Sequence, residues 1–308
     1  MKRFSLVALI FCVSCSSSLA QETNACQTRD VTVNVRDSKG ELMTGLQPAS
    51  FRATLGRQPM RVLASNIVVS GSRVVLLLDL SASMNPEWDL VRSAANHFVV
   101  NASAPLRIGL VTFSDHIIET LNVGSSSHDI HDIIERITKP PDGKGHTSLY
   151  DSMAFAAGLF QKPLPGDAIY VFTDGGDNRS KLNRGDVERL LLSRGIRLFW
   201  FDLYDRYFPT EQGQEGHVDV EDLVKKSGGI AVTADDATLT KGQEFNKLVS
   251  GIYDSMKNFY VLNVETPAGA DDNHAWDLQV LDDQGKKLKG IWVFYPKRLP
   301  PCATTSLH

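Results

Sequence analysis

Three segments of the chain carry oxygen-bearing side chains of the kind that bind a hard cation. Asp79, Ser81 and Ser83 form an Asp-x-Ser-x-Ser run that directly follows five apolar residues. Thr147 and Asp174 follow later in the chain, each at the edge of an apolar segment. Mg²⁺ prefers oxygen ligands in octahedral geometry and usually keeps some of its waters. Two carboxylates and three hydroxyls would therefore hold such an ion and leave room for an incoming ligand.

The apolar runs before the two carboxylates indicate strands that are buried on both faces. Residues 74–78 are all Val or Leu, and residues 168–172 are similarly apolar. Such runs are typical of a parallel sheet that helices cover on both sides. In open α/β sheets, ligands bind beyond the carboxyl ends of the strands. We therefore expect Asp79, Asp174 and the loop of Thr147 to share one rim of the sheet.

The segment from residue 73 to residue 257 alternates strand-like and helix-like patterns. After the first strand, strands are expected at 107–114, 117–123 (an edge), 167–173, 196–203 and 229–233, and helices at 87–101, 127–138, 148–160, 184–194, 219–227 and 243–257. This order favours a doubly wound, mostly parallel α/β sheet. The polar stretch 204–217 has no periodicity and is predicted to be a surface loop, either a partner contact or a mobile insertion.

Two all-β segments flank this α/β body. Strands are expected at 30–36, 51–55 and 60–69 before it, and at 258–266, 275–282 and 288–295 after it. Neither set is large enough to bury a core alone. We therefore predict a small β-sandwich built from both chain ends, with the α/β domain inserted in it. The predicted units are a signal peptide (1–20), the first half-sandwich (27–70), the α/β domain (72–257), the second half-sandwich (258–298) and a tail (299–308).

The first twenty residues have the composition of a secretory signal. Lys2 and Arg3 precede the apolar residues 4–13, and a small-residue site ends at Ala20. Lipidation at Cys15 is the alternative processing route. The apolar run is too short to span a bilayer, which needs about 20 residues, and no longer run follows. We expect a secreted or periplasmic protein without a transmembrane anchor.

Charge and cysteine content agree with export. The chain has 32 basic and 36 acidic residues, a net charge of −4, which favours neither nucleic acid nor an anionic membrane as a partner. Beyond the signal, the cysteines are Cys26 and Cys302, near opposite ends of the chain. In an oxidising compartment a disulfide between them is plausible, and two unpaired thiols are the alternative.

Taken together, the motifs resemble the von Willebrand factor type A domain. The matching stretches are Val-Val-Leu-Leu-Leu-Asp-Leu-Ser-Ala-Ser, Gly-His-Thr-Ser-Leu-Tyr-Asp and Val-Phe-Thr-Asp-Gly-Gly. The resemblance implies a metal-ion-dependent adhesion site that holds Mg²⁺, or Mn²⁺ or Ca²⁺. It implies that Ser81 and Ser83 bind the metal directly, and that Thr147 does so when a ligand is engaged. Asp79 and Asp174 would bind directly or through water, and a partner protein would supply an Asp or Glu carboxylate.

The first flanking segment is similar to that of exported bacterial proteins related to the type A domain. The shared pattern is Val-x-Val-x-Asp-x-x-Gly followed by Gly-Leu, present here from Val33 to Gly40 and at Gly45-Leu46. Where that family has Asp-Phe, this chain has Ser50-Phe51.

Other candidate residues give weaker signals. His146 and Asp177 are candidate rim residues beside the predicted metal ligands, and His128 and His131 have a spacing that suits a transition metal on a helix. A hydrolase built on Ser81 or Ser148 lacks the Gly-x-Ser-x-Gly elbow. We therefore expect a binding protein rather than an enzyme, with a structural or assembly factor of the cell envelope as the alternative.

Overall fold

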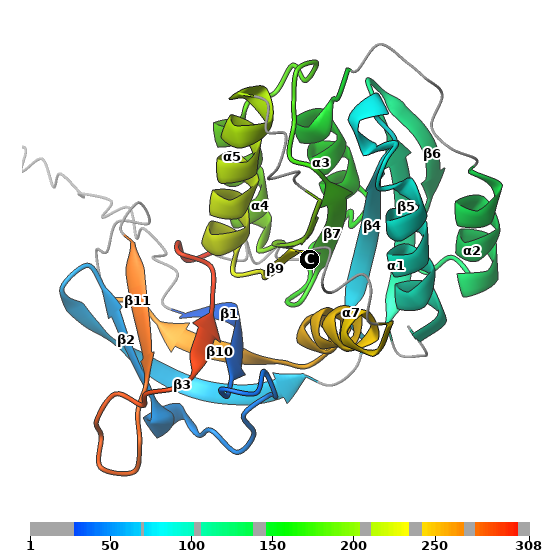
Figure 1. Cartoon of the computed structure of the whole chain (residues 1–308). Coiled ribbons are helices and arrows are strands. Elements are labelled where there is room, and N and C mark those ends of the chain that lie inside the picture. Colours follow the sequence, from blue (N-terminus) through cyan, green and yellow to red (C-terminus); the bar gives the residue numbers. More distant parts are fainter. Residues whose placement is uncertain are drawn as a thin grey trace, which may run out of the picture.

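The computed structural model describes residues 28–68, 71–101, 106–137, 146–203, 211–233, 242–267 and 275–300. Within these ranges the chain forms two six-stranded sheets, which lie in separate domains with helix α7 (Gly242–Lys257) between them (Figure 1). The predicted signal peptide, Cys15, Cys26 and Cys302 lie outside the described residues. No helix in the described ranges combines the length and apolarity needed to cross a membrane.

The α/β domain contains a sheet with the order β6-β5-β4-β7-β8-β9. Its strands are β4 (Arg73–Asp79), β5 (Arg107–Phe113), β6 (Ile117–Leu121), β7 (Ala168–Thr173), β8 (Arg197–Asp202) and β9 (Ala231–Thr233). All neighbours pair in parallel except β6, which is an antiparallel edge strand. The predicted doubly wound, mostly parallel sheet is confirmed.

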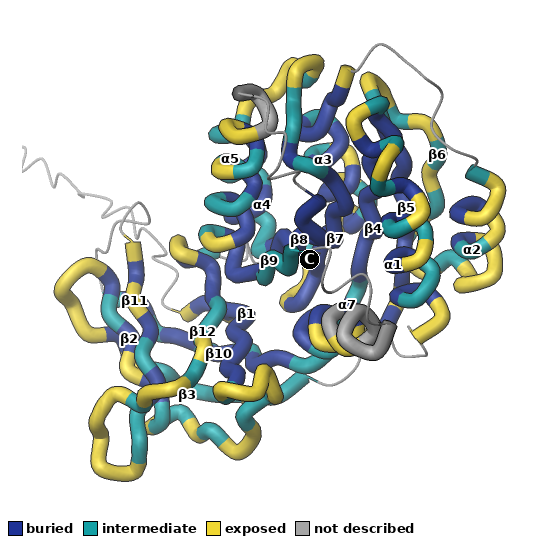
Figure 2. The backbone as a smooth tube through the Cα atoms, viewed as in Figure 1, coloured by how far each residue is buried: buried dark blue, intermediate teal, exposed yellow. Residues whose placement is uncertain are grey.

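Helices cover both faces of this sheet, and its central strands are buried (Figures 1 and 2). On one face lie α1 (Trp88–Asn101), α2 (Ser127–Arg136) and α7; on the other lie α3 (Leu149–Gly158), α4 (Arg184–Arg194) and α5 (Glu211–Ser227). Successive side chains of β4 point to opposite faces. Leu76 packs against the first group of helices and Leu77 against the second, so neither face of the strand meets solvent.

Helix α5 begins earlier than its pattern indicates. The predicted surface loop over 204–217 is wrong for residues 211–217, which are helical, while residues 204–210 lie outside the described ranges. Two glycines, Gly213 and Gly216, lower the helix propensity of this turn. Sequence propensity therefore does not predict the first turns of this helix.

The second sheet joins the two ends of the chain. Its order is β11-β2-β3-β10-β1-β12, formed by β1 (Thr28–Arg36), β2 (Phe51–Leu55), β3 (Gln58–Val68), β10 (Phe259–Glu265), β11 (Trp276–Val280) and β12 (Trp292–Phe294). The prediction of one all-β domain from both flanking segments is confirmed. The strands form one continuous sheet rather than two stacked ones, because β1 pairs with β10 from Thr28 to Val33 and with β12 from Asn34 to Arg36. Their apolar side chains meet in a single cluster.

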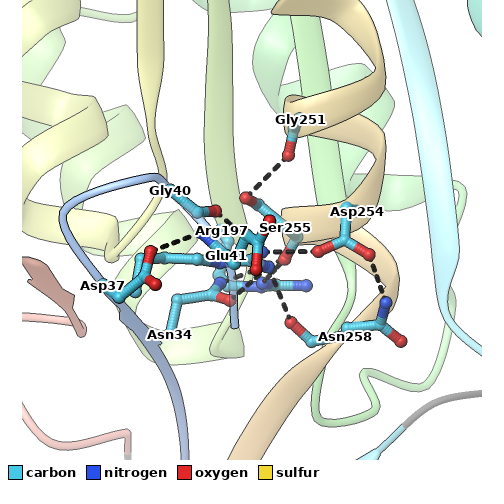
Figure 3. A network of polar contacts seen from close by, with 10 residues as sticks. Asn34, Asp37, Gly40, Glu41, Arg197, Gly251, Asp254, Ser255 and Asn258 are labelled. Carbon is cyan, nitrogen blue, oxygen red and sulfur yellow. Dashed lines mark hydrogen bonds and ion pairs between the residues drawn. The ribbon is translucent and has the colours of Figure 1, made fainter. Parts of the chain in front are cut away.

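A polar network fastens the last turn of α7 to both sheets (Figure 3). The Ser255 carbonyl accepts hydrogen bonds from Asn34 Nδ2 of β1 at 3.0 Å and from Arg197 Nη1 of β8 at 3.1 Å. Arg197 Nη2 also donates to the Met256 carbonyl, and Arg36 pairs with Asp254. Carbonyls at a helix C-terminus lack partners within the helix and carry partial negative charge. Cationic side chains from both domains therefore stabilise this end of α7.

Candidate metal centre

Asp79 lies at the base of the candidate site, at the carboxyl end of the central strand β4. Its side chain is fully buried. Oδ1 accepts a hydrogen bond from the Ser81 amide at 2.8 Å, and Oδ2 accepts one from the Thr173 hydroxyl at 2.7 Å. These two bonds fix the orientation of the carboxylate. Thr173, the last residue of β7, was not among the predicted site residues.

The electrostatics at Asp79 are unfavourable for a carboxylate without a cation. Burial raises the pKa of Asp79 to about 7, and the negative charge of Asp174 contributes to the same shift. Hydrogen bonds from Ser81 and Thr173 oppose the shift without cancelling it. A buried carboxylate whose ionisation is disfavoured by burial and by a neighbouring negative charge is a suitable environment for a divalent cation, whose charge would reverse the effect.

The two serines of the Asp-x-Ser-x-Ser run lie beside Asp79. Ser81 and Ser83 flank the start of a short 3₁₀ helix (Ala82–Met84), and their hydroxyl oxygens are 3.1 Å apart. Ser81 is buried whereas Ser83 is exposed. The pair thus leads from the buried carboxylate toward the surface.

Asp174 stands on the loop after β7, next to Asp79 on the neighbouring strand. Residues Leu78 and Phe172 are in register across β4 and β7, which places the two strand ends side by side. Asp174 is partly exposed, and its Oδ1 accepts a hydrogen bond from the Gly176 amide at 3.1 Å. Asp79 and Asp174 therefore belong to the ends of adjacent strands, and their shared role as metal ligands stays a prediction.

Thr147 contacts the loop that carries Asp174 through its backbone amide and carbonyl. Its amide donates to Asn178 Oδ1 at 2.9 Å, and its carbonyl accepts hydrogen bonds from the amides of Asn178 and Arg179, both at 3.0 Å. The next residue, Ser148, donates its amide to the Ser114 carbonyl just beyond β5 at 2.7 Å. The Thr147 loop therefore lies against the ends of both β5 and β7, and Thr147 is buried there.

Helix α5 supports the Asp174 loop by a direct backbone contact. A Cβ atom built on Gly216 would lie 2.1 Å from the carbonyl oxygen of Gly175. Gly175 has a φ of +93°, which strongly favours glycine at this position. The two glycines therefore allow the backbones of α5 and the Asp174 loop to approach more closely than larger residues would permit. Sequence periodicity did not reveal this role of Gly216.

The two candidate rim residues differ in their surroundings. His146 is exposed beside Thr147. Asp177 Oδ2 accepts hydrogen bonds from the Tyr150 amide at 3.0 Å and from the Ser180 hydroxyl. Asp177 thus stabilises the N-terminus of α3, and a part for it or for His146 at the rim stays a prediction.

The remaining candidates have other partners. His128 pairs with Asp132 at 3.3 Å, and His131 Nδ1 lies 2.9 Å from Asn96 Oδ1. Within the described ranges, no group of three or more His, Cys, Asp or Glu side chains is placed to hold a metal. The Ser148 hydroxyl donates to the Asp115 carbonyl at 2.7 Å. His128, His131 and Ser148 therefore each have a partner among the described residues.

Comparison with known proteins identifies a domain family within the α/β domain. The family model of the von Willebrand factor type A domain matches residues 74–176, the segment that carries all five candidate ligands. No curated protein matches the chain.

Solved structures resemble the chain at low sequence identity. BatB from Bacteroides thetaiotaomicron is 18% identical, with a TM-score of 0.47, over 61% of this chain and 100% of that one. A von Willebrand factor type A protein from Catenulispora acidiphila is 13% identical, with a TM-score of 0.45, over 89% and 74%. Proximal thread matrix protein 1 from the mussel byssus, with a zinc-occupied MIDAS motif, is 17% identical, with a TM-score of 0.49, over 66% and 50%.

Proposed function

Because this chain contains a von Willebrand factor type A domain, we propose that it is an exported binding protein that engages a partner through a divalent cation. Asp79, Ser81, Ser83, Thr147 and Asp174 would hold the ion, with Mg²⁺ as the expected metal and Mn²⁺ or Ca²⁺ as alternatives. The partner would be a protein that presents an Asp or Glu side chain. The protein would act without catalysing a reaction.

The observation that carries this proposal is the pair of carboxylates at the ends of β4 and β7. Asp79 is buried with its pKa raised by burial and by Asp174, and the hydroxyls of Ser81 and Ser83 lie beside it. A bound divalent cation would supply positive charge for both carboxylates and a coordination position for a carboxylate from outside.

The gradient of exposure across these residues supports a role in partner binding. Asp79 and Ser81 are buried, whereas Asp174 is partly exposed and Ser83 is exposed. The buried members would fix the ion, and the exposed members would define the edge that a partner meets. Export rests on the predicted signal over residues 1–20.

Cation binding is tested by isothermal titration of the purified protein with MgCl₂, MnCl₂ and CaCl₂. We expect saturable binding of one ion, and Ser83→Ala should weaken it by about tenfold while leaving the fold intact, since Ser83 is exposed. Ser193→Ala, an exposed serine on α4, is the matched control and should bind as the wild type does. Absence of saturable cation uptake by the wild type would refute the proposed site.

Partner binding is tested by immobilising the protein and applying a cell-envelope extract. Retention in MgCl₂, release by EDTA and loss in Ser83→Ala would support a carboxylate partner held through the metal. Retention that is equal in EDTA and in Ser83→Ala would instead favour the alternative, an envelope structural or assembly factor that uses the domain as a scaffold.

A further inference from the structure

The contacts of Thr147 point to a residue outside the predicted ligand set. We infer that Asn178 is a positioning residue that holds Thr147 against the Asp174 loop and thereby sets the affinity of the site for its cation. The inference rests on the proposed function, because it assigns Asn178 a task within that same site.

Asn178 binds the backbone of Thr147 on both sides. Its Oδ1 accepts the Thr147 amide hydrogen, while its own amide and that of Arg179 donate to the Thr147 carbonyl. Thr147 is 4% exposed and precedes the first turn of α3, so its backbone groups have no helical partners. Buried backbone groups need such partners, and here the Asp174 loop supplies them.

The same loop also caps helix α3. The N-cap residue Ser148 makes no side-chain capping bond. Instead, the amides of Tyr150 and Asp151 donate to Asp177 Oδ2 and Ser180 Oγ, each at 3.0 Å. Hydrogen bonds from successive residues therefore connect the start of α3 to the loop after β7.

Asp151, in the first turn of α3, binds the backbone of the loop in turn. Its carboxylate oxygens accept the amides of Lys181 and Leu182, both at 3.0 Å. Two of the three ligand-bearing segments therefore form one unit, while Asp79 is tied to that unit through Thr173. Within the unit, Asn178 contacts a candidate ligand directly. Asp177 and Ser180 stabilise the helix start, and Asp151 stabilises the loop.

Outer residues that orient metal ligands typically change metal affinity 10–100-fold when replaced. Asn178 is itself exposed, so its replacement leaves the apolar core untouched. We expect Asn178→Ala to reduce affinity for Mn²⁺ about tenfold by freeing the Thr147 segment. Asn178→Asp keeps an acceptor oxygen for the Thr147 amide and should restore most of the affinity.

Asn183 provides a matched control on the same loop. It is also exposed, and its Oδ1 accepts the Asp186 amide at 3.1 Å, the same kind of bond, but at the start of α4. Asn183→Ala should lower the melting temperature without changing Mn²⁺ affinity. If Asn178→Ala binds Mn²⁺ like the wild type, or if both variants lose affinity equally, the inference is wrong.

Amide hydrogen exchange in EDTA separates this inference from the proposed function. Asn178→Ala should accelerate exchange at residues 147–151, and Asn178→Asp should not. A wild type that takes up Mn²⁺ while Asn178→Ala shows neither lost affinity nor faster exchange refutes the inference and leaves the function standing. A wild type that takes up no divalent cation refutes the proposed function and the affinity role together, with exchange reporting separately whether Asn178 holds the segment.

Discussion

At the scale of single residues, the buried Asp79 carboxylate suits the binding of a cation but destabilises the fold when no cation is bound. A buried carboxylate is unfavourable unless a cation or enough hydrogen bonds compensate it. The two hydrogen bonds to Asp79 leave its pKa raised from 3.8 to about 7. The fold therefore tolerates a group that destabilises it at neutral pH, as expected for a residue retained for a ligand.

Asp79→Asn should stabilise the protein in EDTA at pH 8 and abolish Mg²⁺ binding. The amide can accept from the Ser81 amide and donate to the Thr173 hydroxyl, so it keeps both contacts without the charge. Because the folded pKa lies above the unfolded value, the stability contributed by protonated Asp79 is lost as pH rises from about 4 through about 7. A raised pKa of this size corresponds to on the order of a few kcal/mol.

Thermal melts in EDTA between pH 5 and pH 8 measure this effect. The wild type should lose more stability than Asp79→Asn across that range, and the two should converge toward pH 5. Added MgCl₂ should raise the melting temperature of the wild type most at pH 8, where Asp79 is ionised. Parallel pH profiles for the two proteins would contradict the assignment of the buried charge.

The candidate ligands were predicted from oxygen-bearing residues beside apolar runs together with the resemblance to the von Willebrand factor type A motifs. Thr173 and Asn178 gave no such signal. Thr173 bonds Asp79 across 94 positions of sequence, and Asn178 bonds Thr147 across 31. Supporting residues of this kind depend on which strands are neighbours, which the order β5-β4-β7 determines and local sequence does not.

At the scale of elements, helix α5 is an element whose start sequence periodicity does not predict. Strands β4, β7 and β8 were predicted well because runs of buried apolar residues have few other interpretations. The first turns of α5 were predicted as loop because the polar stretch 204–217 has no periodicity, and glycine contributes to that lack of a helical pattern. Gly216 is also needed for the close contact between α5 and Gly175. The residue that permits this packing is therefore one that weakens the helical pattern in the sequence.

Gly216→Ala should destabilise the protein and weaken cation binding. Alanine normally favours a helix by up to about 1 kcal/mol over glycine. Here the added Cβ would lie 2.1 Å from the Gly175 carbonyl oxygen, so α5 or the Asp174 loop must move, and such overpacking typically costs about 1–3 kcal/mol.

Gly251→Ala is the matched control, because a Cβ at this exposed position of α7 meets nothing within 4 Å. It should raise stability by about 0.5–1 kcal/mol and leave Mn²⁺ affinity unchanged. Urea unfolding in EDTA and calorimetric titration with MnCl₂ measure the two effects. Equal stabilisation by both substitutions would show that the contact between Gly216 and Gly175 is not restrictive.

At the scale of the whole molecule, contacts between distant parts of the chain hold the two domains together. Strand β1 precedes the α/β domain in the sequence and β10 follows it, and the two strands pair from Thr28 to Val33 of β1. Arg197, buried between the two domains, lies over the rings of Phe199 and Phe259 at 5.1 and 4.5 Å. The sequence pattern indicated a β domain shared by both chain ends. The polar junction at α7 could not be predicted in this way, because its side chains come from β1, β8 and α7, which are far apart in the sequence.

The predicted Cys26–Cys302 disulfide belongs to this scale, since it would close almost the whole chain into a loop. Both cysteines lie outside the described residues, but Arg29 Nη1 donates to the Pro300 carbonyl at 2.9 Å, which brings nearby positions at the two ends together. A crosslink over so long a loop typically stabilises a fold by about 2–5 kcal/mol. Reduction should therefore lower the melting temperature of the wild type by several degrees and leave a Cys26→Ser, Cys302→Ser variant unaffected. Mass spectrometry after alkylation without reductant should detect no free thiol at either cysteine, and two alkylated cysteines would disprove the bond.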